Sequence, residues 1–423
     1  MRRYARVSVA ALAITTFALA ACGRSSDTSG QDTSAAPVAT GDVSGTLNVW
    51  AMGTEGEALG EFAKGFTKEN PDVTVNVTAI PWDAAHDKIA TAIAADETPD
   101  VSMIGTTWMG EFATSGGLDP TPDVVDKSTF FDGAWGSTEV GGTSYAVPWY
   151  VETRVIYVDT ALAEKAGVSA TPATWDDLMA TSKGMQSAGA QWGINLQPGQ
   201  TGAWQTFLPF AWQAGAEIMN SDQTKFTFDS PEFVKALTYY QSFFTEGVAP
   251  KELPDGTLEP DFVAGKIGAF SSGPWHIGIL KDTGGDTFMD GVTLAPMPKD
   301  VKQASFIGGS NLAVFKSSKN RDAAWKFVQW LSQPEVQAEW YTTTSDLPAV
   351  QSAWKQGDLA SDKNLAVFGD QMTTAMAPPS VPTWEQIASV IDTELEKVCK
   401  SGEDPAAAAK AIQQQAESIG TGL

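Results

Sequence analysis

Hydrophobic and polar positions follow a regular order over residues 46–104. Strands are predicted at residues 46–50 and 73–77, where apolar and polar residues alternate, and at the short apolar run 101–104. Helices are predicted between them, because apolar residues recur there every three or four positions: Leu59, Phe62, Ala63 and Phe66 in the first, and Ile89, Ala92 and Ile93 in the second. This strand-helix-strand-helix-strand order predicts a parallel sheet with helices on both faces.

Predicted strands and helices also follow one another in the rest of the chain. Residues 145–158 are predicted to be extended and 193–196 to form a strand, while residues 320–331 form an amphipathic helix. Three further helices have sequence signals at their starts: Thr174 with Asp177 as a capping box, Ser230 before Pro231, and Asp404 before Pro405. The fold class is therefore α/β.

The N-terminus has the layout of a secretory signal. Basic residues at positions 2, 3 and 6 precede an apolar, uncharged run over residues 7–21, which is shorter than a comfortable membrane span. Leu19-Ala20-Ala21-Cys22 resembles the lipobox of bacterial lipoproteins, which implies cleavage before Cys22 and acylation, including palmitate, at that residue. An ordinary signal peptide with a chance cysteine is the alternative. We expect a signal peptide over 1–21, a disordered tether over 22–44, and a position on the outer face of the cytoplasmic membrane.

The amino-acid composition indicates which classes of binding partner the chain can have. The chain has a formal net charge of −24, and nucleic-acid binding requires basic surfaces, so we expect no nucleic-acid partner. With only two histidines and two cysteines, a metal site is not expected, and neither is a cofactor. Cys399 is expected to be a buried, unreactive thiol. The 15 tryptophans suit carbohydrate binding, because an indole stacks on the apolar face of a sugar ring.

Several segments in sequence order resemble a known family. They are residues 66–75, 98–101, 108–112, 116–118, 145–148, 272–275 and 307–310, spread over most of the chain. Together they are similar to the extracellular solute-binding proteins of bacterial ABC importers, in the maltose/trehalose-binding class. The resemblance implies two discontinuous α/β lobes of the periplasmic-binding-protein type II kind, with a hinge and a central ligand cleft. The N-terminal lobe would comprise 45–152 and 305–346, and the C-terminal lobe 153–304 and 347–423, with crossings near 152–154, 304–306 and 346–348.

The resemblance also implies a function without catalysis. The chain would be a monomer that captures a carbohydrate, a di- or oligosaccharide, by lobe closure and delivers it to the membrane permease subunits. The sequence contains no P-loop, so we expect the ATPase to be another chain. An extracellular glycoside hydrolase is an alternative, since it also uses paired carboxylates beside aromatic residues. A binder of a non-sugar solute such as a polyol is another.

Ligand contacts are expected where predicted strands end. Glu55 and Glu57 follow the first strand, where the family places sugar-binding carboxylates, although Glu57 is equally suited to a capping box with Thr54. Thr107 and Trp108 follow the third strand, in a loop where many relatives carry an aspartate that this chain lacks.

Further candidates lie near the expected crossings. Tyr150 and Glu152 match an aromatic and an acid of the family, with an ion pair between Glu152 and Arg154 as the alternative. Trp275 in Gly-Pro-Trp matches a position that often forms the sugar platform, and Trp204 is a second stacking candidate. Gly309 and Ser310 would offer backbone amides and a hydroxyl, unless the glycines serve only a bulge or hinge.

Overall fold

The computed structural model describes residues 35–254 and 256–423, and all statements below concern these residues. The expected signal peptide, Cys22 and residues 22–34 of the expected tether lie outside the described part. Residues 35–44 form no helix or strand, but they are attached to the fold: Arg321 Nη2 donates to the carbonyl of Ala36 at 2.8 Å. Within the described ranges, no helix combines the length and the apolar character that crossing a membrane requires.

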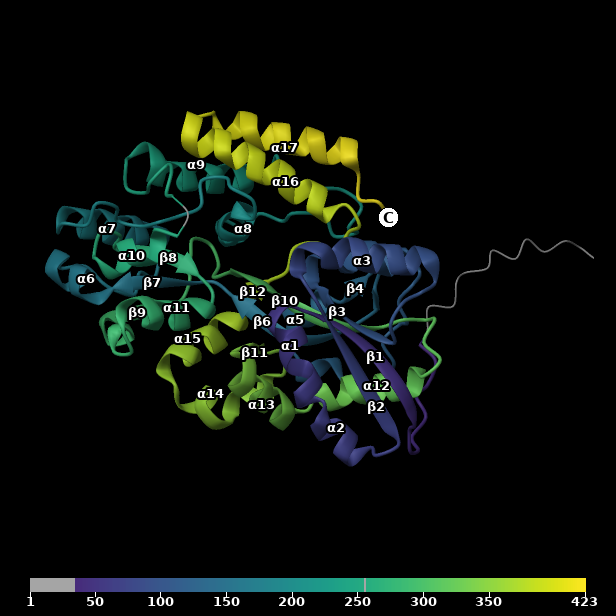
Figure 1. Ribbon diagram of the computed structural model, residues 1–423. Coiled ribbons are helices and arrows are strands. Elements are labelled where there is room, and N and C mark those ends of the chain that lie inside the picture. The colour runs from purple at the N-terminus through teal and green to yellow at the C-terminus, as the bar shows by residue number, and fades with distance from the viewer. Residues whose placement is uncertain (1–34, 255) are drawn as a thin grey trace, which may run out of the picture. The chain divides into compact units, whose positions relative to one another are not determined.

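The larger of the sheets is seven-stranded and mixed (Figure 1). Its order is β11-β6-β10-β3-β1-β2, with β12 paired to β10. The strands are β1 (Gly45–Met52), β2 (Val73–Ile80), β3 (Val101–Gly105), β6 (Val147–Thr153), β10 (Ser305–Val314), β11 (Leu347–Pro348) and β12 (Ala375–Met376). β1 pairs in parallel with β2 and β3, as the sequence predicts. The sheet as a whole is not parallel, however, because β10 runs antiparallel to both β3 and β6.

Helices cover both faces of this sheet, as predicted. Successive side chains of a strand point to opposite faces, so Met103 packs in one apolar cluster and Ile104 in another. The first cluster contains residues of α1 (Gly53–Phe62), α2 (Lys64–Glu69), α12 (Arg321–Leu331) and α13 (Pro334–Thr344). The second contains residues of α3 (Trp82–Ala95) and α4 (Met109–Thr114). The carboxyl ends of β1, β2 and β3 therefore open between two helical layers.

A second, three-stranded antiparallel sheet has the order β8-β7-β9. Its strands are β7 (Val155–Asp159), β8 (Ala269–Ser272) and β9 (Val292–Ala295). Helices around it include α6 (Thr160–Ala166), α7 (Trp175–Ser187), α8 (Ala203–Gln213), α9 (Pro231–Thr245), α10 (Leu258–Val263) and α11 (Trp275–Gly284). A short hairpin of β4 (Glu139–Val140) and β5 (Thr143–Ser144), preceded by α5 (Asp132–Gly136), completes the sheet elements.

The predicted helix starts at Thr174, Ser230 and Asp404 are confirmed. Thr174 and Asp177 form a complete capping box on α7, and Ser230 accepts from the amide of Phe233 at the start of α9. Asp404 accepts from the amide of Ala407 in α17 (Pro405–Ile419). Each cap satisfies an amide that the first helical turn leaves without an internal partner.

The predicted strand at 193–196 is wrong. This segment makes only isolated bridges, such as Asn195 to Phe270. The amide of Gly193 instead donates to the carbonyl of Val248 at 2.9 Å, and a Cβ on Gly193 would lie 2.1 Å from the carbonyl oxygen of Ser182. The segment is thus held by a loop and a helix, which prevents a continuous strand ladder.

The chain passes between the sheets at three places. Arg154 joins β6 to β7, and residues 296–304 join β9 to β10, near the expected crossings. The third passage differs from the expected one near 346–348, because β11 still pairs with β6 and β12 still pairs with β10. Between them lie α14 (Gly357–Ser361) and α15 (Lys363–Met372). The chain leaves the larger sheet only after β12, through residues 377–383, and α16 (Trp384–Glu396) and α17 then pack beside α8 and α9.

Candidate functional site

A cavity of about 560 Å³, here called the main cavity, collects residues from the ends of many elements. The carboxyl ends of β1, β2 and β3 supply Glu55, Trp82 and Trp108, and the paired strands β6 and β10 supply Tyr150 and Gly309. Other lining residues are Thr54, Gly105, Thr106, Thr107, Val151, Glu152, Gln205, Pro274, Trp275, Phe306, Gly308, Thr344, Ser345, Asp346 and Leu347. Open α/β sheets bind ligands beyond the carboxyl ends of their strands, which is where this cavity lies.

Carboxylates and a phenol lie together on one side of the main cavity. Thr54 Oγ1 donates to Glu55 Oε2 at 3.1 Å, and Ser310 Oγ lies 3.3 Å from the hydroxyl of Tyr150. Burial, together with the nearby charge of Glu55, raises the pKa of Asp346 to about 7. Burial, Glu55 and Asp346 also hold the pKa of Tyr150 well above its usual value. Tyr150 therefore keeps its proton at neutral pH, and the group offers both a donor and acceptors to a polar ligand.

Two indoles meet at the ends of β2 and β3. The rings of Trp82 and Trp108 lie edge to face with their centroids 5.8 Å apart. Trp108 is also in contact with His86, whose Nε2 lies 3.0 Å from Glu111 Oε2. Trp82 is 39% exposed, which is unusual for so large an apolar side chain. A surface of this kind suits stacking against a flat apolar face of a ligand.

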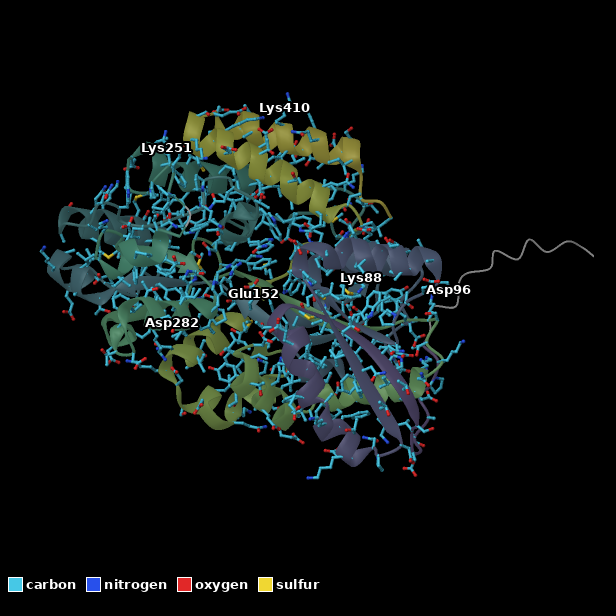
Figure 2. The ribbon with its side chains drawn as sticks, in the orientation of Figure 1. Lys88, Asp96, Glu152, Lys251, Asp282 and Lys410 are labelled. Atoms are coloured by element: carbon cyan, nitrogen blue, oxygen red, sulfur yellow. The ribbon has the colours of Figure 1, made fainter. Side chains whose placement is uncertain are left out.

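A third indole borders the cavity from the side of the smaller sheet. Trp275 opens α11 and is 41% exposed. The guanidinium Cζ of Arg154 lies 4.6 Å from the centroid of its ring. Arg154 Nη1 donates to Glu152 Oε2 at 2.9 Å, and Nη2 donates to Gln205 Oε1 at 2.7 Å. Arg154 thus fixes an acid, an amide and an aromatic ring around the junction of the two sheets, where Figure 2 labels Glu152.

Seven of the ten ligand-binding residues expected from the sequence line this one cavity. They are Glu55, Thr107, Trp108, Tyr150, Glu152, Trp275 and Gly309. Ser310 lies one position away, fully buried behind Tyr150. Glu152 lines the main cavity and also forms the ion pair with Arg154 that was the alternative to ligand contact.

Two expected residues lie elsewhere. Glu57 is exposed and outside the main cavity, and it closes no capping box, because α1 begins at Gly53 and Thr54 bonds to Glu55. Trp204 is only 4% exposed and packs edge-on against Phe306 and Trp384 in the core. Its amide lies in the first turn of α8 and its ring turns inward, which leaves no face of Trp204 lining the cavity.

Gly309 has a backbone role that the sequence raised as an alternative. Its φ is +119°, a conformation that side chains disfavour. A Cβ at this position would lie 2.2 Å from the carbonyl oxygen of Tyr150. The register of β10 against β6 also shifts between Ser310 and Asn311. Gly309 therefore permits the close approach and the bulge that set Tyr150 beside the cavity.

The lining residues that were not among those expected include Trp82, Gln205, Asp346 and Phe306. Trp82 had a usable signal, since it follows Pro81 directly after a parallel strand, at the edge where ligands bind. Asp346 also had a signal, since a crossing beside the cleft was expected near 346–348. Gln205 had none, because it reaches the cavity only through the packing of distant segments.

Within the described ranges, no group of three or more histidine, cysteine or acidic side chains is placed so that it could hold a metal ion. Cys399 is fully buried, as expected, and burial raises the pKa of its thiol, so it stays protonated.

Comparison with known proteins agrees with this architecture. The solved structure of the sugar-binding protein MalE from Xanthomonas citri superposes with a TM-score of 0.84 at 34% identity, over 89% of this chain and 97% of that one. The mixed α/β fold is thus that of MalE-type periplasmic binding proteins.

Residues 50–338 match the family model of the bacterial extracellular solute-binding proteins, and the chain belongs to this family of binders, which are not enzymes. The diacetylchitobiose-binding protein DasA of Streptomyces coelicolor is 28% identical over 93% of each chain. The maltotriose-binding protein of Pyrococcus abyssi is 27% identical over 82% of this chain and 77% of its own.

Proposed function

We propose that this chain is the receptor of an ABC importer for a neutral carbohydrate, a di- or oligosaccharide. The observation that carries the proposal is the main cavity, in which the exposed indoles of Trp82 and Trp275 lie with the acids Glu55, Glu152 and Asp346. Indoles stack on the apolar faces of sugar rings, while carboxylates accept hydrogen bonds from the hydroxyls at their edges. The sugar ligands named for the relatives support the same ligand class.

The acidity of the site argues for a neutral ligand. Three carboxylates line the main cavity, and no lysine or arginine does. Arg154 lies beside it but is already engaged by Glu152 and Gln205. A sugar phosphate or another anion would meet the carboxylate of Glu55 with no free cation among the described lining residues to compensate its charge.

Capture is proposed to occur by closure of two lobes around the cavity. We assign residues 45–153 and 305–376 to the first lobe, and residues 155–304 and 384–423 to the second. Trp82, Trp108 and Tyr150 then belong to the first lobe, and Gln205 and Trp275 to the second. A ligand that contacts both sets favours the closed form, because it binds that form more tightly than the open one. The closed form would be the one that the permease recognises.

Attachment to the membrane is a separate proposal that rests on sequence alone. Leu19-Ala20-Ala21-Cys22 supports cleavage before Cys22 and acylation of that residue. Its test is metabolic labelling with a palmitate analogue in a bacterial host. The full chain should be labelled and pellet with membranes, and Cys22→Ala should be unlabelled. Labelling of Cys22→Ala, or an unlabelled wild type, would contradict acylation at this position.

Carbohydrate binding is tested by a thermal-shift screen of the purified protein. The panel contains malto-, chito- and galacto-oligosaccharides, trehalose, and the polyols sorbitol and mannitol. A ligand at 100 times its Kd adds about 2.7 kcal/mol to the free energy of unfolding, which is readily visible as a rise in Tm. A rise with a saccharide supports the proposal. A rise with a polyol alone assigns the site to that solute class and contradicts the carbohydrate proposal.

A further inference from the structure

A second cavity, of about 780 Å³, adjoins the main cavity and is here called the side cavity. Gln205 and Trp275 line both, so the two cavities meet at these residues. The bridge from Glu152 through Arg154 to Gln205 marks the boundary between them. Each cavity alone has the volume of a small-molecule site, which is about 300 to 1,000 Å³.

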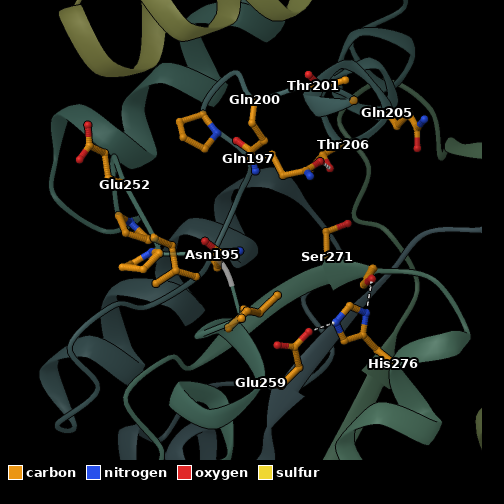
Figure 3. Close-up of a pocket in the computed structure, with 18 of the residues that line it drawn as sticks. Asn195, Gln197, Gln200, Thr201, Gln205, Thr206, Glu252, Glu259, Ser271 and His276 are labelled. Carbon is orange, nitrogen blue, oxygen red and sulfur yellow. Dashed lines mark hydrogen bonds and ion pairs between the residues drawn. The ribbon is translucent and has the colours of Figure 1, made fainter. Parts of the chain in front are cut away.

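The side cavity is lined mainly by groups that suit hydroxyls. In Figure 3, Gln197 and Gln200 lie across the cavity from Glu259 and His276, with Asn195 and Glu252 on a third side. Amides offer both donors and acceptors, and carboxylates offer acceptors. No metal ligand set is formed among the described residues. Arg154, Lys251 and Lys400 also line the side cavity, but each already has a partner. Arg154 donates to Glu152 and Gln205, Lys251 Nζ donates to the carbonyl of Lys400, and Lys400 Nζ pairs with Glu396. With its cations engaged in this way, the lining fits a neutral polyhydroxy group.

One acid in this cavity is held by a hydrogen-bonded chain. His276 Nε2 lies 2.9 Å from Glu259 Oε1, and His276 Nδ1 lies 2.6 Å from Ser272 Oγ. Burial is the main cause that lowers the pKa of His276, so the imidazole is neutral at pH 7 and carries one proton. A carboxylate can only accept, so that proton lies on Nε2, and Ser272 donates to Nδ1.

This chain of bonds fixes the direction of Glu259. The His276 side chain is 10% exposed and that of Glu259 is 21% exposed, so the imidazole is enclosed while the acid still reaches the cavity. The second carboxylate oxygen, Oε2, is not the one that His276 engages. Because the Glu259 carboxylate is already held in one direction, it loses little conformational entropy when it accepts a hydrogen bond from a ligand hydroxyl.

We infer that the side cavity is a second compartment of the ligand site, in which Glu259, oriented by His276, accepts a hydroxyl of an additional sugar unit. The inference rests on the proposed carbohydrate function and extends it: the ligand passes Trp275 and is longer than the main cavity alone holds. Glu259 contacts the ligand, and His276 is a positioning residue.

The test is the dependence of affinity on ligand length. Two series of increasing length are used: maltose to maltopentaose, and N-acetylated chitobiose to chitotetraose. Calorimetry measures Kd for each member of the series that binds the wild-type protein. Wild-type affinity should rise about tenfold or more when the unit that enters the side cavity is added. Glu259→Gln should lose most of that gain and bind the shortest ligand within about twofold of wild type.

A matched control lies on the same helix. Asp261 is also on α10, outside both cavities, with its carboxylate 2.8 Å from Lys266 Nζ, so Asp261→Asn should leave the whole length series unchanged. His276→Ala should lose the gain as Glu259→Gln does, and His276→Gln, whose amide can donate to Glu259, should restore part of it. Because the chain has only two histidines, the ¹⁵N signals of His276 can also be followed. They should shift with the longer ligand and not with the shortest.

Two failures are distinguishable. If no saccharide binds the wild-type protein, the proposed function fails, and the second compartment fails with it. If saccharides bind but Glu259→Gln leaves the length dependence intact, or weakens all lengths equally, only the second compartment is overturned.

Discussion

The guanidinium of Arg154 lies over the indole of Trp275, with Cζ 4.6 Å from the ring centroid. These residues come from different segments, the passage from β6 to β7 and the first turn of α11. Their contact places the most exposed tryptophan of the described chain at the junction of the two cavities. A cation over an aromatic face stabilises by about 0.5–1 kcal/mol at an exposed site, enough to orient the ring without burying it.

Replacement of Trp275 tests its role as a platform. Trp275→Ala should weaken binding of the best saccharide by about tenfold or more, which corresponds to about 1.4 kcal/mol, and should lower the Tm of the unliganded protein little. Ile279 on the same helix is 39% exposed and lines neither cavity, so Ile279→Ala is the control and should bind normally. A large drop in the unliganded Tm of Trp275→Ala would indicate a core residue instead.

The glycine before the platform controls where the ring lies. A Cβ on Gly273 would lie 2.0 Å from Cζ3 of Trp275, so Gly273→Ala must displace the indole. We expect an affinity loss of about the same size as for Trp275→Ala. Gly278→Ala is the matched control on α11, since a Cβ there meets nothing within 4 Å. Calorimetry measures the saccharide affinity of both variants. Unchanged affinity in Gly273→Ala would show that the position of the ring is unimportant.

Asp346 should make stability depend on pH. Its pKa is raised to about 7 in the folded protein, against about 3.9 in the unfolded chain. The neutral form therefore favours folding, and this contribution is fully present below about pH 4 and lost as the pH rises to about 7. Asp346→Asn, which keeps an acceptor for Trp340 Nε1, should melt above the wild type at pH 8, and the difference should shrink towards pH 5.

The control for this profile is the exposed Asp123, whose replacement by asparagine should leave the pH dependence of Tm as in the wild type. A constant difference between Asp346→Asn and wild type from pH 5 to pH 8 would mean that Asp346 titrates normally in the folded protein.

Asp392 should stabilise the start of α8 across a long sequence distance. Its two carboxylate oxygens accept from the amides of Gly202 and Trp204 at 2.7 and 2.8 Å, which are groups that a helix start leaves without internal partners. Asp392→Ala should therefore reduce the free energy of unfolding by about 1–2 kcal/mol in urea titration. Glu385→Ala, at an exposed position on the same helix α16, should cost far less. Equal losses would argue against the capping role.

Local patterns predicted much of the fold. The alternation in β1 and β2, the helical spacing in α12, and the caps at Thr174, Ser230 and Asp404 are short-range signals, and the structure confirms them. Short-range signals could not predict that β10 pairs antiparallel with β3 and β6, because the partners of a strand are segments far away in the sequence. For the same reason the third passage between the sheets was placed too early.

The candidate site residues were also predictable only where a local signal marked them. Glu55 and Trp108 were expected because they follow strands whose carboxyl ends meet, and Tyr150 was expected through the family resemblance; all three line the main cavity. Trp204 was misplaced, since neither composition nor spacing reveals that its ring turns inward to Phe306 and Trp384. Asp346 was missed although a crossing was expected near 346–348, and Gln205 was missed because tertiary packing alone brings it to the main cavity.

The central claim, that the main cavity holds a neutral carbohydrate between indoles and carboxylates, is tested most directly by calorimetric titration of the purified full chain with malto- and chito-oligosaccharides. The account predicts saturable binding of at least one of them at a stoichiometry of one, strongly weakened in Trp275→Ala and intact in Ile279→Ala. Absence of binding by any saccharide to a folded wild-type protein, or binding that Trp275→Ala leaves unchanged, would contradict it.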